Sequence, residues 1–166
     1  MTDFTDEEYQ DMGSLNHSLT QAQLVRSLPN DKFTIAVELS LDISQIDAKQ
    51  FGLKAKEELK PDVCLYPNSV VFSKPRDILK MSNMPLLSIE ILSPTQSVEE
   101  LLAKIQAYFA LGIKSCWLVI PAFSSVIVYA SGSLDNFKNF DKRDTEVVDE
   151  VLDIRVPLQK IFPSAV

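Results

Sequence analysis

The sequence is poor in the residues on which several common kinds of site depend. It contains one histidine, two cysteines and four glycines among 166 residues. A single histidine excludes a metal site built from several histidines, and Cys64 and Cys116 lack the spacing of metal ligands. Both cysteines lie in apolar segments, so we interpret them as small buried residues in a reducing compartment. No glycine-rich phosphate loop, internal repeat or low-complexity tract is present.

Positive charge is also scarce. Sixteen Lys and Arg residues face 23 Asp and Glu residues, which gives a net charge of −7 and an isoelectric point near 4.7. Such a chain does not coat nucleic acid by overall electrostatics, so any contact with nucleic acid needs a local basic patch. The segment 68–84 carries Lys74, Arg76 and Lys80, with Asp77 among them. Both a solvated loop and a phosphate contact fit this segment.

Long hydrophobic runs are absent except for the charge-free stretch Ser115 to Leu134. Pro121 and the Ser131-Gly132-Ser133 turn interrupt this stretch, which favours two strands over a membrane span. The N-terminus is acidic and lacks the apolar core of a signal peptide. We therefore predict a cytoplasmic protein that makes no membrane contact.

The length and the 46% hydrophobic content fit one globular domain that buries a sizeable core. Residues 1–13 are rich in acids and poor in apolar side chains, which is typical of an arm at the surface. The sequence therefore predicts an acidic N-terminal arm over residues 1–13 and a single α/β domain over residues 14–166.

The segment Pro85 to Pro121 predicts a strand, a helix and a second strand. Residues 86–92 are apolar on both faces, as in a central strand covered on both sides. Ser97 has the position of an N-cap, and Gly112 marks the end of the helix. Lys104 and Tyr108 fall together on one flank of the helix, at the border between core and solvent.

The rest of the chain predicts further elements of the same domain. We expect the following: a helix over residues 15–28 that carries His17 in its first turn; a strand over 33–41; a connection or short helix over 47–60; a short strand that opens with Asp62; a loop over 68–84; strands over 126–130 and 137–140; and a short helix over 158–162.

Three carboxylates stand where apolar neighbours make a charge costly: Glu38, Asp62 and Glu90. Carboxylates so placed often share a cation. Mg²⁺ takes one or two protein carboxylates together with waters and phosphate oxygens, and a nearby lysine can orient the attacking water. Asp62, Glu90 and Lys104 supply these parts.

The order of these residues resembles that of the PD-(D/E)XK nuclease superfamily, and more narrowly that of the Uma-two family. The following features carry the resemblance: Pro61-Asp62-Val63, the strand and turn Ile89-Glu90-Ile91-Leu92-Ser93-Pro94, Lys104 and Tyr108 on the next helix, Gly112-Ile113 before Trp117-Leu118-Val119, and His17 on the first helix. The resemblance covers roughly residues 14–130.

The resemblance implies a restriction-endonuclease-like mixed β-sheet flanked by helices, and cleavage of DNA phosphodiester bonds that depends on Mg²⁺ or Mn²⁺. It implies that Asp62 and Glu90 are metal ligands. The lysine expected two residues after the second acid is Leu92 here, so the resemblance implies that Lys104 takes its place. The first helix lacks the acid that the superfamily often has there, which leaves Glu38 as the substitute candidate.

Each candidate also has a structural interpretation. Asp62 could organise a turn after Pro61, Lys104 could pair with Glu100 on the helix surface, and His17 could serve packing. Tyr108 and Trp117 are typical core residues. For the whole protein, the alternative to an endonuclease is a catalytically silent relative that acts as a homo-oligomeric binding or regulatory protein. In either case we predict a homo-oligomer, specified as a homodimer.

Overall fold

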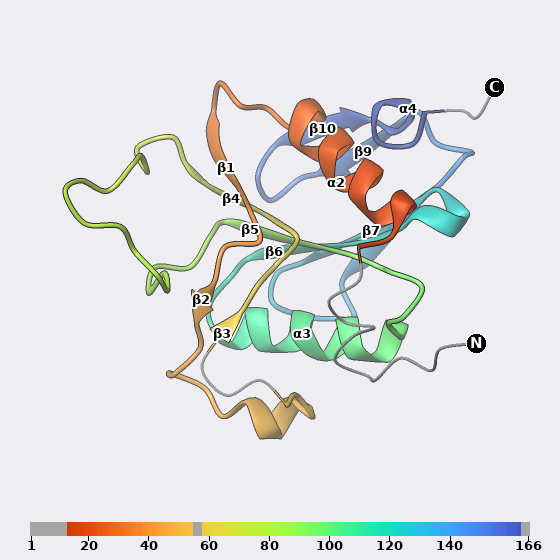
Figure 1. Cartoon of the computed structure of the whole chain (residues 1–166). Coiled ribbons are helices and arrows are strands. Elements are labelled where there is room, and N and C mark those ends of the chain that lie inside the picture. The colour runs from red at the N-terminus through yellow and green to blue at the C-terminus, as the bar shows by residue number, and fades with distance from the viewer. Residues whose placement is uncertain (1–12, 55–57, 164–166) are drawn as a thin grey trace, which may run out of the picture.

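The computed structural model of the chain describes residues 13–54 and 58–163. These residues form a mixed six-stranded sheet flanked by helices, with the strand order β1-β4-β5-β6-β7-β8 (Figure 1). The predicted single α/β domain is confirmed. Residues 1–12 of the predicted N-terminal arm lie outside the described residues, so the arm stays a prediction.

The sheet surrounds the predicted strand-helix-strand unit. Its strands are β1 (Phe33–Val37), β4 (Val63–Pro67), β5 (Leu87–Ile91), β6 (Ser115–Ile120), β7 (Ser125–Ala130) and β8 (Phe137–Phe140). Strands β5 and β6 run parallel and are joined through helix α3 (Val98–Ala110), whereas every other neighbouring pair is antiparallel. The sequence placed all six strands within a few residues of these bounds.

Different elements cover the two faces of the sheet (Figure 1). Helix α2 (Leu15–Ser27) lies on one face together with the hairpin of β9 (Glu146–Asp149) and β10 (Ile154–Pro157) and the short helix α4 (Leu158–Ile161). Helix α3 lies on the other face, beside the small sheet of β2 (Leu41–Asp42) and β3 (Glu58–Leu59) and the 3-10 helix η1 (Ala48–Phe51). A second 3-10 helix, η2 (Pro121–Phe123), joins β6 and β7. Within the described ranges, no helix is long and apolar enough to cross a membrane.

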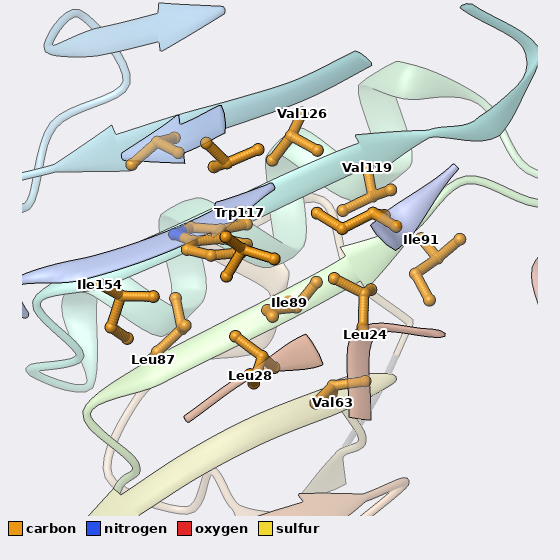
Figure 2. Close-up of a cluster of buried hydrophobic side chains, with 14 of the residues drawn as sticks. Leu24, Leu28, Val63, Leu87, Ile89, Ile91, Trp117, Val119, Val126 and Ile154 are labelled. Carbon is orange, nitrogen blue, oxygen red and sulfur yellow. The ribbon is translucent and has the colours of Figure 1, made fainter. Parts of the chain in front are cut away.

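Strand β5 lies where the two apolar cores meet. All five of its residues are buried. Leu87, Ile89 and Ile91 point into the core beneath α2, where Leu24 of that helix and Leu28, its C-cap, pack against the sheet (Figure 2). The alternate residues Ser88 and Glu90 face α3, because side chains alternate along a strand. A carboxylate therefore lies inside the molecule on the α3 side.

Helix α3 begins and ends as the sequence predicts. The Ser97 hydroxyl accepts a hydrogen bond from the Glu100 backbone N–H at 3.1 Å, and Gly112 adopts a left-handed φ of 94° after the last turn. One position differs from the prediction: Tyr108 is fully buried and does not lie at the border with solvent. The sheet and η1 both pack against α3, so its buried face is wider than the apolar stripe alone suggests.

Strand β1 is shorter than the alternation of residues 33–41 predicts. Glu38 has a left-handed φ of 50°, which breaks the strand after Val37. This residue reverses the faces: Phe33 and Ile35 pack into the core beneath α2, whereas Leu39 packs with the core beneath α3. The apolar residues therefore keep the predicted spacing of two, but those before Glu38 and those after it pack on opposite faces of the sheet.

A buried carboxylate that the sequence did not single out attaches the C-terminal hairpin to the sheet. Asp149 on β9 is fully buried and accepts hydrogen bonds from the Ser115 hydroxyl, from Trp117 Nε1 at 2.8 Å and from the Leu152 backbone N–H at 3.1 Å. Asp149 lies among alternating acids whose pattern indicates a solvated strand. Three donors aimed at one carboxylate compensate for its burial.

We predict that Asp149→Ala lowers the free energy of unfolding by roughly 2–5 kcal/mol, because it leaves two buried donors and one partly buried donor without an acceptor and opens a cavity. Urea denaturation would measure the change. Glu150→Ala is the matched control: its ion pair with Lys138 is exposed, so the loss should stay within about 0.5 kcal/mol. Equal effects of the two variants would contradict a role for Asp149 in attaching the hairpin.

Candidate active site

The three carboxylates singled out by the sequence lie in or next to three neighbouring strands: Glu38 follows β1, Asp62 precedes β4 and Glu90 lies in β5. Val37 of β1 pairs with Val63 of β4, and Val63 pairs with Ile89 of β5. One residue further along the same register, Glu38, Asp62 and Glu90 follow one another across the sheet. The Glu38 backbone N–H also donates to the Asp62 carbonyl oxygen at 3.3 Å. The topology therefore brings together the three predicted acids.

Helix α2 contacts Asp62 from one side of this row. His17 Nε2 lies 3.1 Å from Asp62 Oδ1, and Gln21 Nε2 donates to the Asp62 carbonyl oxygen at 2.8 Å. The two side chains are four residues apart, so they project from one face of the helix. The other carboxylate oxygen, Oδ2, accepts from the Ile91 backbone N–H at 2.7 Å. Asp62 is thus fixed in place by a helix and by the neighbouring strand, which is more than a turn residue requires.

His17 contacts a candidate site residue and does not serve helix packing alone. Its hydrogen bond to Asp62 raises the pKa of the imidazole, and the negative charges of Asp62, Glu90 and Glu38 add to this, although partial burial acts against it. The imidazole therefore lies in the negative field of all three acids. The structure places Glu38 at the exposed end of β1, within electrostatic range of His17.

Helix α3 contacts Glu90 from the opposite face. Glu90 is 2% exposed, and the Tyr108 hydroxyl donates to Glu90 Oε1 at 2.6 Å. Burial raises the pKa of Glu90 to about 7; the positive charge of Lys104 acts against this shift, the charge of Asp62 adds to it, and the Tyr108 hydrogen bond again opposes it. Tyr108 is therefore both a core residue and a partner of the candidate site.

Lys104 lies one helical turn before Tyr108 and is partly buried. Its charge is the first of the influences that favour the ionised form of Glu90. Within the described part of the chain it makes no ion pair, and no pair with Glu100 forms there. Lys104 therefore acts on Glu90 through space, and the alternative of a surface pair with Glu100 is not what the structure shows.

The donor set bears on which metal could bind. Asp62 and Glu90 offer hard carboxylate oxygens, which suit Mg²⁺ or Mn²⁺. Among residues 13–54 and 58–163, no three His, Cys, Asp or Glu side chains form a group that could hold a metal ion. Two carboxylates fit an ion such as Mg²⁺, which keeps several of its waters, and they do not fit a closed cage of protein ligands.

The ends of the helices define the edge at which these groups meet. In Figure 1 the carboxyl end of β5 points to the same side of the molecule as the amino ends of α2 and α3, one helix on each face of the sheet. Sequence reasoning did not find Gln21 or the Ile91 backbone N–H. Gln21 could have been found from its spacing of four residues from His17. The contact of the Ile91 backbone N–H with Asp62 depends on strand register, which the sequence does not reveal.

An open groove of about 1180 Å³ lies elsewhere, between α2 and the region of α4. Thr20, Gln23 and Arg26 of α2 line it, together with Lys142 and Leu158. Neither Asp62 nor Glu90 lines this groove. The candidate site is therefore identified from its carboxylates and does not coincide with this groove.

Comparison with known proteins gives a family match and a similar solved structure. The family model of Uma2, described as "Putative restriction endonuclease", matches residues 6–158. Among solved structures, the chain is similar to a "putative nuclease belonging to DUF820 from Anabaena variabilis", with a TM-score of 0.69 and 19% sequence identity over 96% of this chain and 98% of that chain. The chain has no match among curated proteins. The structural neighbour confirms the predicted fold.

We predict that Glu90→Gln is at least as stable as the wild type in metal-free buffer above pH 7. Between about pH 4.5 and 7 the folded protein holds a proton on Glu90 that the unfolded chain has released, so the stability of the wild type falls as pH rises through this window. A glutamine at this position does not titrate, so the variant does not lose stability in this pH window. Its amide oxygen can still accept the hydrogen bond from the Tyr108 hydroxyl. The difference between the variants should grow by roughly 1–3 kcal/mol from pH 5 to pH 8.

Urea denaturation in EDTA across this pH range would measure the difference. Glu100→Gln, a change at an exposed acid on α3, is the control and should leave the pH profile unchanged. A loss of several kcal/mol by Glu90→Gln at every pH, as when one member of a buried ion pair is removed, would show that Glu90 has a structural role.

Proposed function

Because the chain belongs to the Uma2 family, whose description is "Putative restriction endonuclease", we propose that it is an endonuclease that hydrolyses DNA phosphodiester bonds with the help of Mg²⁺ or Mn²⁺. One observation carries this proposal. Glu90 lies in the fully buried strand β5, within the electrostatic range of Lys104 and of Asp62, which precedes the neighbouring strand β4. A buried acid is costly, and a cation shared with a second acid would repay that cost.

Asp62 and Glu90 would hold the metal ion. When bound, such an ion would supply positive charge for the phosphoryl oxygens and for the attacking water. The protein contributes the orientation of the two carboxylates: His17 and the Ile91 backbone N–H fix Asp62, and Tyr108 fixes Glu90. Groups held in this way need little rearrangement during the reaction, which is how positioning lowers a barrier.

Lys104 would take the role of the lysine that the superfamily has two residues after the second acid. Its ammonium group would orient the nucleophilic water and stabilise charge that develops on the phosphoryl oxygens. The influence of Lys104 on the pKa of Glu90 supports this role. Glu38 would complete the row at its exposed end, in place of an acid on the first helix.

The alternative is a catalytically silent relative that keeps the fold as a homo-oligomeric binding or regulatory protein. Two observations favour it. Leu92 stands at the usual position of the lysine, and both carboxylate oxygens of Asp62 already have partners in His17 and the Ile91 backbone N–H. The predictions of a homodimer and of a cytoplasmic location belong to this proposal and do not discriminate between its two forms.

We expect isothermal titration calorimetry with Mn²⁺ to detect binding to the wild type that the double variant Asp62→Asn with Glu90→Gln has lost. The reason is that neutral amides replace both charged ligands. Glu99→Gln, at an exposed position of α3, should bind as the wild type does. Absence of binding in the wild type would favour the silent relative.

We predict that Lys104→Met lowers the rate of plasmid nicking in Mn²⁺ by roughly 10²-fold or more, while metal affinity stays nearly unchanged. Lys104→Arg should restore only part of the rate, because a planar guanidinium replaces a compact ammonium. Lys114→Met, a change at an exposed lysine, is the control and should nick at the wild-type rate. Nicking that persists unchanged in Lys104→Met would remove Lys104 from the mechanism.

A further inference from the structure

Ten consecutive exposed residues project from the sheet between β4 and β5. We call residues 71–80 the finger, because every one of them is exposed while the residues on either side are partly buried. In Figure 1 the finger belongs to the yellow-green loop that extends away from the sheet, on the side opposite the amino ends of α2 and α3. An exposed segment of this length in a folded domain is commonly a functional one.

Hydrogen bonds hold both ends of the finger. At its start, the Thr34 hydroxyl donates to the Val70 carbonyl oxygen at 2.7 Å. At its end, the Met81 backbone N–H donates to the Ser40 carbonyl oxygen at 2.8 Å, and the Met81 carbonyl oxygen accepts from the Asp42 backbone N–H at 2.8 Å. The base of the loop is therefore fixed to β1 and β2, and the finger has a defined starting position.

The finger combines positive charge with exposed apolar side chains. It carries Lys74, Arg76 and Lys80 against Asp77 alone, so its net charge is +2 in a chain whose net charge is −7. The Asp77 carboxylate accepts from the neighbouring Ile78 backbone N–H at 2.8 Å and so serves the local turn. Phe72 is 92% exposed. Leu79 is 87% exposed and Val71 75% exposed.

We infer that the finger is a DNA-contacting element, with Lys74 and Arg76 on backbone phosphates and with Phe72 and Leu79 against the groove. Lysine and arginine bind phosphates, and exposed Phe and Leu side chains are the kind that wedge between base steps in a minor groove. The inference rests on the proposed nuclease function and deepens it by naming a substrate contact. A second copy of the chain is the competing occupant that the test below distinguishes.

Strand β4 determines how far the finger lies from the candidate carboxylates. Strand β4 begins next to Asp62 and ends at Pro67, close to the start of the finger. Five strand residues span roughly 17 Å. This equals about five base steps at 3.4 Å each, and the finger extends further in the same direction, so a duplex that contacts both the candidate site and the finger spans more than five base steps.

Binding of a labelled 30-base-pair duplex to the full chain in EDTA, followed by fluorescence anisotropy over a salt series, tests this inference without cleavage. We expect Lys74→Gln with Arg76→Gln to weaken binding about 10-fold or more near 0.1 M salt, and to reduce the slope of log K against log salt by about 2. The control, Lys114→Gln with Lys142→Gln, has the same net charge at exposed positions elsewhere and should keep the wild-type slope.

Phe72→Ser tests the apolar contact separately. It should weaken binding several-fold without changing the salt slope, since no phosphate contact is lost. Phe123→Ser, at a phenylalanine of η2 that is 71% exposed, should have no effect. A wild type that does not bind DNA, or finger variants that bind as their controls do, would overturn the inference. So would Phe72→Ser if it changed the mass measured by sedimentation and left DNA affinity unchanged, because a second copy would then be the occupant.

The outcomes for the finger and for the nuclease are separable. Finger-dependent binding by a wild type that fails to nick a plasmid in Mn²⁺ would support the finger and reject the nuclease. Nicking by a wild type whose finger variants bind and nick normally would support the nuclease and reject the finger.

Discussion

The burial of the Glu90 carboxylate in β5 is the constraint on which the arrangement of this protein depends. The strand is covered by an apolar core on each face, so the carboxylate has almost no access to water. Its partners must therefore come from the protein, and they do: a hydroxyl from α3, the charge of Lys104, and the field of His17. Moving α3 by one helical turn would leave a buried acid without compensation.

Two helices reach the carboxylates from opposite faces of the sheet. Helix α2 fixes Asp62 through His17 and Gln21, and α3 fixes Glu90 through Tyr108. In each helix the two residues that interact with the candidate acids, His17 and Gln21 or Lys104 and Tyr108, are four residues apart. The neighbouring turns of the same helices carry the core residues Leu24 and Ile105, so packing and site geometry are set by the same helix placement.

Sequence patterns predicted most of the fold because its elements obey local rules. The apolar run of β5, the Ser97 cap and Gly112 need no knowledge of distant residues. What the patterns could not supply depends on contacts far apart in the chain. The left-handed conformation of Glu38 and the burial of Asp149 arise only once β4 and the C-terminal hairpin are in place, and the contact of Gln21 with Asp62 joins residues 41 positions apart. The three candidate acids stood out in the sequence because a charge within an apolar run is itself a local signal.

The acidity of the chain is compatible with a DNA substrate if contact is confined to a few places. An acidic surface repels the duplex over most of the protein, which suppresses nonspecific binding in other orientations. Positive charge at the finger, beside exposed apolar side chains, would then favour the orientations in which the duplex contacts this loop. Strand β4 connects the two regions within the fold, because Asp62 precedes it and the finger follows it, so the position of the finger relative to the candidate carboxylates is set by a buried strand.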